Sequence, residues 1–445
     1  MKKSGFVMST YVYMLLVFFL LVILSMLAVL NNSRLLSNKL KEKSTDLNIV
    51  LIGNNQINLE LGTEYIEPGY VAQTATGEEL EVDITSDLDV THVGTYSITY
   101  TAKKGTNTIS ETRTIIVYKK FVTYITNLYN NGTNEEGLEK DDTSDENIRY
   151  TGSEPKNYVT FNNELWRIIG IFNVSNGTTT EPKIKLVRNE SIGNYSWDSS
   201  AGNNSGTHED GEVNDGYGVN QWGASTYTDS SIYEGADLMR ELNTLYLNQE
   251  SGICYNGSND ASTACDFSTI GINDTYRGMI ESAVWHTGAM DWNSSGATGQ
   301  SASIAYNEER GTTTGQICKG KADEDVARCT DEVVRTTTWE GLVGLIYPSD
   351  YGYASTDTSC RENINDNTNN SCINDNWLYS NSDYWTLSPR AASYSCNAWI
   401  VSTYENATDN TARYGNGVRP SVYLKSSVNV IGGDGTQASP YQLNI

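Results

Sequence analysis

The sequence predicts a multidomain chain that combines one transmembrane helix, an all-β sandwich and a larger α+β region. Three observations lead to this prediction. An uncharged apolar run occupies residues 11–30, apolar and polar residues alternate in short segments up to residue 120, and mixed strand and helix patterns follow from residue 150. The roughly 400 residues beyond the apolar run are enough for two or three domains of ordinary size.

The apolar run from Tyr11 to Leu30 contains no charged residue. A helix of about 20 such residues crosses the hydrocarbon core of a bilayer. A cleaved signal peptide is the alternative, because Lys2 and Lys3 precede the run. Its apolar region would be shorter, about 7 to 15 residues, and the only candidate cleavage site, around Ala28, has Met26 where a small residue is needed. We therefore expect an uncleaved signal anchor.

The first residues, KKSGF, resemble the start of a type IV prepilin, in which a basic leader ends in Gly-Phe before a long apolar helix. That resemblance implies cleavage between Gly5 and Phe6 and assembly into a filament. The chain departs from the prepilin pattern at Thr10, where this family carries a glutamate.

Basic residues flank the apolar run on both sides, so the positive-inside rule does not decide the orientation. The short tail and the seven cysteines favour export. We expect residues 1–43 to form a cytoplasmic tail, a transmembrane helix and a juxtamembrane stem in the cell membrane, with the bulk of the chain extracellular.

The composition is acidic, with 55 Asp and Glu against 30 Lys and Arg and a formal charge of −25. Such a chain repels phosphate backbones and anionic lipids, so we expect no nucleic-acid partner. Calcium and neutral glycans are compatible with this charge. Solubility of a surface protein explains the same charge without any ligand.

Residues 44–120 show the period-two pattern of half-buried strands. Ile49 and Leu51 alternate with polar residues, and Tyr96–Ala102 does so again, which predicts a sandwich of seven short strands. The segments LGTEYIEPGYVA, DITSDLDVTHVGTYSITYTA and TRTIIV resemble the bacterial Ig-like domain named after a pesticidal crystal protein. That resemblance implies a spacer or adhesion module of a surface protein.

Residues 121–149 are rich in carboxylates, and we interpret them as an acidic linker. The cluster lacks the ligand spacing of a calcium loop. The mixed strand and helix patterns of residues 150–445 then predict an α+β domain. Its elements are a hairpin around Asn162 and Asn163, a strand at 183–188, helices at 236–247 and 275–284, and terminal strands at 398–401 and 418–424.

Five segments of this region, YVTFNNELWRIIGIF, KLVRNESIGNYSWD, WEGLVGLIYPSDYGYAS, YWTLSPR and GVRPSVYLKSS, resemble an uncharacterised domain of surface proteins from Gram-positive gut bacteria. The block Tyr384–Pro389, followed by Gly417–Pro420, is similar to the end of the C-type lectin-like and formylglycine-generating-enzyme-like fold. The resemblance implies a compact α+β domain whose irregular loops bind ligands, and it transfers no specific chemistry.

Six of the seven cysteines form local pairs with gaps of 11 or 12 residues, which suit small disulfide-closed loops in an exported protein. Zinc would need closer spacing. The candidate pairs are Cys254 with Cys265, Cys318 with Cys329, and Cys360 with Cys372. Cys396 is left over, and the copper-binding cysteine pair of formylglycine-generating enzymes has no clear counterpart around it.

Catalytic patterns are weak. The chain has three histidines and neither a G-x-S-x-G elbow nor a phosphate-binding glycine loop. We therefore expect no enzyme. An extracellular enzyme of the formylglycine-generating type, dependent on Cys396, is the less favoured alternative.

Aromatic residues are the strongest binding signal, with 29 tyrosines and nine tryptophans among short polar side chains. Four tryptophans at strand positions are expected in the core, namely Trp166, Trp339, Trp385 and Trp399. Four in polar loops are expected to contact a ligand, namely Trp197, Trp222, Trp292 and Trp377. Asn374, Asp375 and Asn376 are candidate calcium ligands. The sequence thus predicts a non-catalytic adhesion protein that binds a glycan or a surface protein; a pilin-like or envelope scaffold is the alternative.

Overall fold

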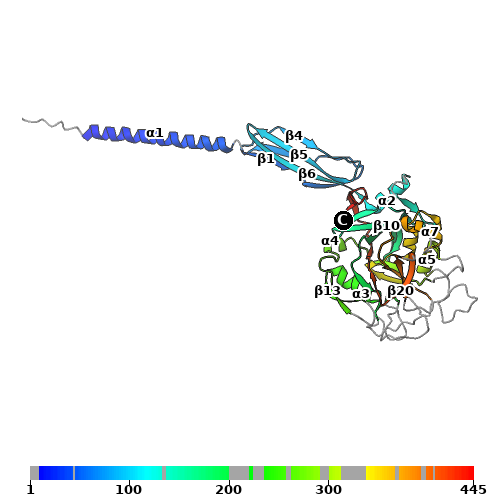
Figure 1. The fold of residues 1–445 in the computed structure, drawn as a ribbon. Coiled ribbons are helices and arrows are strands. Elements are labelled where there is room, and N and C mark those ends of the chain that lie inside the picture. Colours follow the sequence, from blue (N-terminus) through cyan, green and yellow to red (C-terminus); the bar gives the residue numbers. More distant parts are fainter. Residues whose placement is uncertain are drawn as a thin grey trace, which may run out of the picture. The chain divides into compact units, whose positions relative to one another are not determined.

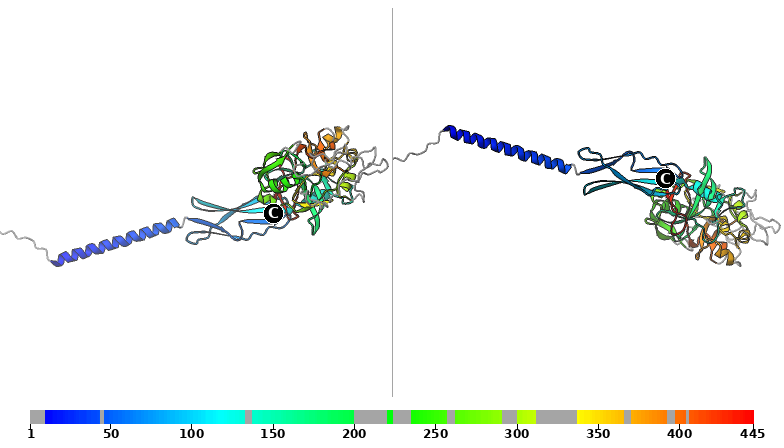
Figure 2. Two further views of the ribbon diagram at one scale, coloured as in Figure 1. Left: turned by 90° about the horizontal axis from the view of Figure 1, so that it is seen from below. Right: turned by 90° about the horizontal axis from the view of Figure 1, so that it is seen from above.

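A computed structural model describes residues 10–43, 46–132, 137–199, 220–223, 235–256, 262–290, 300–311, 337–365, 370–391, 397–403 and 406–445. The chain divides into two compact units, Met1–Val117 and Tyr118–Ile445. The first unit holds the long helix α1 and an antiparallel β-structure, and the second holds most of the sheets (Figures 1 and 2).

Helix α1 covers Thr10–Lys43. Its segment Tyr13–Leu35 is long and apolar enough to cross a membrane. The predicted apolar helix is therefore confirmed, and it continues beyond Leu30. A signal sequence near the N-terminus would meet the same criterion of length and composition.

Among its described residues, the rest of the first unit contains six strands, one fewer than predicted. They are β1 Leu47–Leu51, β2 Gln56–Glu60, β3 Tyr70–Thr74, β4 Val82–Ser86, β5 Gly94–Lys104 and β6 Asn107–Lys120. Strand β1 pairs with β3, while β6 pairs with β2 and β5, and β5 pairs with β4. Ile98, Tyr100 and Ala102 are buried on one face of β5, which confirms the predicted alternation.

A buried arginine supports this core, which has no cysteine between residues 44 and 120. The Arg113 Nη2 atom donates to Glu67 Oε1 and to the carbonyl of Gly69, each at 3.0 Å. Partial burial opposes ionisation of Glu67, but hydrogen bonds from Tyr100 and Tyr65 hold its pKa below the usual value. The polar cluster thus stabilises the loop that carries Glu67.

The second unit is mostly β and is built from several sheets. The largest has the order β17-β22-β11-β10-β8-β7, with β9 also paired to β10. Its strands are β7 Leu138–Lys140, β8 Ile148–Tyr150, β9 Tyr158–Phe161, β10 Glu164–Ser175, β11 Thr180–Arg188, β17 Val343–Gly344 and β22 Ser421–Tyr423.

A five-stranded sheet has the order β12-β21-β18-β19-β20. Its strands are β12 Asn194–Ser196, β18 Tyr384–Pro389, β19 Asn397–Ser402, β20 Asn406–Thr411 and β21 Gly415–Gly417. Smaller pairings join β13 Ser251–Tyr255 with β14 Ser262–Asp266, β15 Ala283–His286 with β16 Thr338–Gly341, and β23 Asn429–Gly432 with β24 Gln442–Asn444. Strand β23 also pairs with Lys119 and Lys120 at the end of β6.

The helices of the second unit are short: α2 Phe121–Asn130, α3 Asp237–Glu241, the π-helix η2 Leu242–Tyr246, α4 Asp274–Arg277, α5 Ala302–Glu309, α6 Pro348–Tyr353, α7 Thr358–Glu362 and α8 Asn370–Asn374. The helix predicted at 236–247 corresponds to α3 and η2. The helix predicted at 275–284 is wrong, because α4 ends at Arg277 and β15 begins at Ala283.

The prediction of an acidic linker at residues 121–149 is also wrong, because this segment forms α2, β7 and β8. Phe121 and Ile125 are buried on α2, and the Phe121 ring packs edge-on against Tyr441 at 5.5 Å. The Asp141 carboxylate is buried rather than solvated. A buried charge is tolerated there because the Arg149 guanidinium pairs with it, with Nε 2.6 Å from Asp141 Oδ2.

Four charged side chains form a network in the core of the second unit. Arg149 donates through Nε to Asp141 at 2.6 Å and through Nη1 to Asp350 Oδ1 at 2.8 Å. Lys185 Nζ contacts Asp350 Oδ2 at 2.6 Å. Burial opposes charge on Asp350, but the neighbouring Lys185 and Arg149 cations hold its pKa below the usual value. The network connects β8, β11 and α6.

Replacing Arg149 with Met should destabilise the second unit by about 3–5 kcal/mol, because the buried Asp141 would lose its cation and the buried Asp350 would keep only Lys185. All nine tryptophans lie beyond residue 117, so their fluorescence during urea unfolding reports on this unit. The control is Lys140→Met, which removes an exposed pair with Glu146. Equal urea midpoints for the two variants would contradict the role assigned to Arg149.

Candidate functional site

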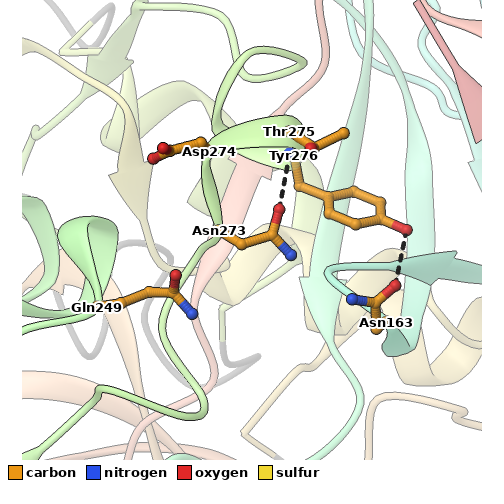
Figure 3. A pocket seen from close by; sticks show the side chains of 6 residues that line it. All are labelled: Asn163, Gln249, Asn273, Asp274, Thr275 and Tyr276. Atoms are coloured by element: carbon orange, nitrogen blue, oxygen red, sulfur yellow. Dashed lines mark hydrogen bonds between the residues drawn. The ribbon is translucent and has the colours of Figure 1, made fainter.

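A surface cleft with a volume of about 530 Å³ lies in the second unit (Figure 3). We call it the amide cleft, because three of its lining side chains are amides. This volume lies within the range of small-molecule sites, roughly 300 to 1,000 Å³. The lining residues are Asn163, Gln249, Asn273, Asp274, Thr275 and Tyr276.

The hairpin between β9 and β10 forms one wall of the amide cleft. Its two turn residues, Asn162 and Asn163, have φ angles of 56° and 61°. Asparagine tolerates this left-handed region better than most residues and is typical of two-residue hairpin turns. The Asn163 side chain reaches the cleft, where its Oδ1 atom accepts a hydrogen bond from the Tyr276 hydroxyl at 3.2 Å.

Gln249 forms a second wall, shortly after the π-helix η2. Its φ of 57° is uncommon for a glutamine, and such backbone strain clusters at ligand sites. Gly271 allows the close packing behind it, since a Cβ there would lie 2.5 Å from the Tyr246 carbonyl and 2.9 Å from Gln249 Cα. Within the described part of the chain, no hydrogen bond occupies the Gln249 side-chain amide.

Helix α4 and the residue before it form the floor. Asn273 caps the helix by accepting from the Tyr276 backbone at 3.3 Å. Its own backbone N–H donates to Asn162 Oδ1 at 2.9 Å, and Asn162 Nδ2 donates to the Gly271 carbonyl at 2.9 Å. Asn162 therefore ties the hairpin to the floor of the cleft.

The Tyr276 ring is supported from the core. It packs edge-on against Phe161 with ring centroids 5.1 Å apart, and Phe161 packs in the same way against the buried Trp166. Tyr276 itself is half-buried. Its ring is thus held in position at the cleft while part of it stays accessible.

The amide cleft presents groups that both donate and accept hydrogen bonds next to an aromatic ring. Asp274 adds a carboxylate, which pairs with Arg277 at the rim. The lining contains no histidine or cysteine. This chemistry suits reversible binding of an uncharged ligand with many hydroxyl groups.

The predicted ligand contacts of three tryptophans are wrong. Trp197, Trp222 and Trp377 are buried, with exposed fractions of 0%, 1% and 6%. Trp197 donates to the Thr386 carbonyl at 3.0 Å, and Trp377 donates to the Tyr150 carbonyl at 2.8 Å. These indoles lie in the core although their neighbours in the sequence are polar. Trp292 lies outside the described residues.

The tryptophans expected in the core behave as predicted with one exception. Trp166, Trp385 and Trp399 are fully buried, whereas Trp339 on β16 is only half-buried. Its ring lies 6.0 Å from that of Trp222. Position in a strand or a loop was therefore a poor guide to exposure in this unit.

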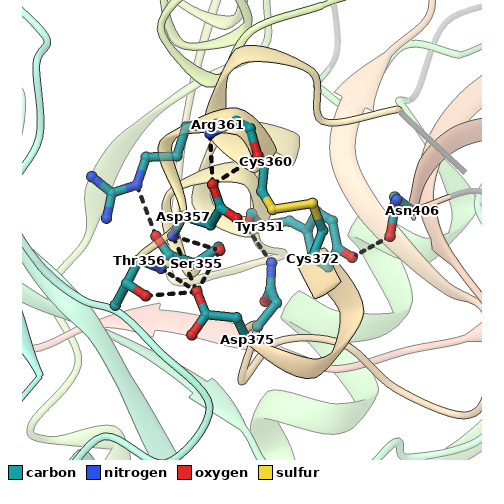
Figure 4. Close-up of a disulfide and its surroundings, with 11 residues drawn as sticks. Tyr351, Ser355, Thr356, Asp357, Cys360, Arg361, Cys372, Asp375 and Asn406 are labelled. Atoms are coloured by element: carbon teal, nitrogen blue, oxygen red, sulfur yellow. Dashed lines mark hydrogen bonds between the residues drawn. A yellow bond between two sulfur atoms is a disulfide. The ribbon is translucent and has the colours of Figure 1, made fainter. Parts of the chain in front are cut away.

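Two of the three predicted disulfides are confirmed, Cys254–Cys265 and Cys360–Cys372. Cys318, Cys329 and Cys396 lie outside the described residues. Figure 4 shows the second bridge, which joins α7 to α8.

Two of the three candidate calcium ligands, Asp375 and Asn376, make hydrogen bonds within the protein near this bridge, which Figure 4 shows with Asp375. Asp375 Oδ2 accepts from Ser355 Oγ and from the Thr356 backbone, each at 2.7 Å. The buried Asn376 donates to the Tyr351 carbonyl at 2.8 Å. The loop uses both side chains to hold its own backbone. Across the described residues, no group of three or more His, Cys, Asp or Glu side chains is placed to hold a metal ion.

Residues 49–117 match the family model of the bacterial surface protein Ig-like domain. This match agrees with the resemblance seen in the sequence. Together with the apolar N-terminal helix, which is a signal or an anchor, it indicates a membrane-associated surface protein.

A search of curated proteins found no match to the chain. Among solved structures, the lipoprotein BT2262 from Bacteroides thetaiotaomicron is 19% identical over 32% of this chain, with a TM-score of 0.16. The aligned part spans 61% of that lipoprotein. A likeness at this level supports no conclusion about fold or function.

Replacing Asn162 with Gly should loosen the amide cleft. Glycine keeps the left-handed turn but removes both side-chain hydrogen bonds, so we expect a loss of about 1–3 kcal/mol in stability. Hydrogen exchange at the Asn273 amide should accelerate. The control is Asn163→Gly at the next turn position, where the side chain makes only an exposed bond to Tyr276. An unchanged exchange rate at the Asn273 amide in Asn162→Gly would contradict the role of Asn162 in joining the hairpin to the floor of the cleft.

Proposed function

We propose that this chain is a membrane-anchored, non-catalytic surface protein that binds a neutral glycan in the amide cleft. The observation that carries the proposal is that the Tyr276 ring lines the same cleft as the side-chain amides of Asn163, Gln249 and Asn273 (Figure 3). Sugars offer an apolar ring face to an aromatic side chain, and their hydroxyl groups pair with amides.

The charge of the chain narrows the ligand class. A protein with a formal charge of −25 repels sulfated and sialylated glycans, and Asp274 places a carboxylate in the cleft itself. Neutral glycans meet no such penalty. The pre-positioned hairpin and helix α4 lower the entropic cost of binding, because the lining residues are already ordered.

In this proposal the Ig-like segment is a spacer, and the second unit is a lectin-like binding module held outside the cell by α1. The support is the surface-protein Ig-like match and the apolar helix. Two features support the alternative, a pilin-like scaffold: the KKSGF start and the exposed apolar helix. Mass analysis of the mature N-terminus separates the two, because the scaffold requires cleavage after Gly5.

Binding of the detergent-purified full chain to a panel of neutral and anionic glycans tests the proposal. We expect saturable binding to a neutral glycan. Repeating the measurement with and without a chelator tests whether binding needs calcium. Tyr276→Ala should weaken binding at least about tenfold, equivalent to about 1.4 kcal/mol, whereas Tyr276→Phe should retain most of it.

Tyr414→Ala is the control, because it removes an exposed tyrosine that does not line the cleft. Absence of binding to any neutral glycan by the folded chain would contradict the proposal. Equal affinity of the Tyr276→Ala and Tyr414→Ala variants would place the binding site elsewhere.

A further inference from the structure

Lys185 lies in a closed aromatic chamber together with the Asp350 carboxylate. Its Nζ atom is 2.6 Å from Asp350 Oδ2, and the two residues have exposed fractions of 0% and 2%. The ammonium group also lies 4.0 Å from the centroid of the Tyr347 ring and 5.3 Å from that of Trp285. An amine and a carboxyl group are thus held in contact where water is excluded.

Amide formation needs a neutral amine and a carboxylic acid, and burial opposes the charge on both side chains, although the neighbouring cations favour the charged form of Asp350. Burial lowers the pKa of Lys185 to about 8 despite the Asp350 charge. Across a hydrogen bond of 2.6 Å, transfer of the ammonium proton to Asp350 Oδ2 gives an amine and a carboxylic acid. In a dry environment, a neutral pair avoids the desolvation cost that an ion pair carries.

The surroundings of Asp350 match the charge that develops during attack on its carboxyl carbon. Arg149 Nη1 donates to Oδ1 at 2.8 Å, and the backbone N–H of Tyr347 donates to Oδ2 at 2.9 Å. Oδ1 is the oxygen that becomes negative when the amine adds. A fixed guanidinium at that atom stabilises the tetrahedral intermediate in the manner of an oxyanion hole.

We propose that Lys185 and Asp350 form an intramolecular amide bond. The Lys185 Nζ atom attacks Asp350 Cγ, a C–N bond forms, the Cγ–Oδ2 bond breaks, and Oδ2 leaves as water with two protons from the amine and acid. The reaction needs no oxidant and no co-reactant. The amide joins β11 to α6.

Charge balance of the core supports the amide. Before the reaction Lys185 is paired with Asp350, and the neighbouring Arg149 is paired with Asp141 as well as with Asp350. The reaction removes one cation and one anion. Arg149 keeps Asp141 as its carboxylate partner, so the reaction leaves neither of these two buried charges alone.

Glu309 has a positioning role beside the reacting pair. Glu309 is fully buried and accepts two hydrogen bonds from Ser349, one from the backbone N–H at 2.8 Å and one from the hydroxyl at 2.6 Å. These bonds hold Ser349, which directly precedes Asp350 in the sequence. Burial raises the pKa of Glu309 to about 7. A neutral Glu309 adds no negative charge against the attack on Asp350.

Peptide mass spectrometry of the full chain, after reduction, alkylation and trypsin digestion, tests the proposal. Trypsin cannot cut after an acylated lysine, so residues 184–188 should remain one peptide, joined to residues 336–361 with the loss of one water. Lys185→Arg should give only separate peptides. Lys183→Arg is the control, because Lys183 is also buried on β11 but pairs with Glu281 at 2.8 Å.

Separate peptides from the folded wild-type chain, with trypsin cutting after Lys185, would overturn the proposal. This readout does not depend on whether Lys185→Arg folds. A linked pair that persists in Lys185→Arg would also overturn it, since another lysine would then be the donor.

Discussion

The second unit depends on the neutralisation of charges that its core encloses. Arg149 and Lys185 both contact Asp350, so the single carboxylate on α6 meets cations from β8 and β11. Each of these charges would be costly alone in a dry interior. The pairing is therefore possible only when the strands and the helix are all in place. This requirement specifies how short elements, separated by long polar loops, come together.

The amide cleft uses this packed interior as its support. Its ring residue, Tyr276, rests on Phe161 and Trp166, and Asn162 joins the hairpin to the loop before α4. A binding site made of turn residues is precise only when those turns are held from behind. The cleft meets this condition with few residues, because two asparagines both shape the backbone and supply hydrogen-bonding groups.

Local sequence signals predicted what is local in the structure. The alternation around Ile98 and Tyr100, the Asn162-Asn163 turn, and the bridges Cys254–Cys265 and Cys360–Cys372 all follow from spacings of a few residues. The acidic segment was misread because the partner of Arg149 on α6 lies 201 residues away in sequence. The cleft was missed for the same reason, since Asn163, Gln249 and Tyr276 come from three distant segments. Tryptophan exposure also depends on partners that are distant in the sequence, such as Thr386 for Trp197, and composition does not contain that information.

Hydrogen–deuterium exchange of the full chain, with and without a bound neutral oligosaccharide, tests the central claim most directly. The account predicts slower exchange on binding in three segments only, around the β9–β10 turn, the residues after η2, and the loop into α4. Protection confined to other segments, with these three unchanged, would contradict the assignment of the amide cleft as the binding site.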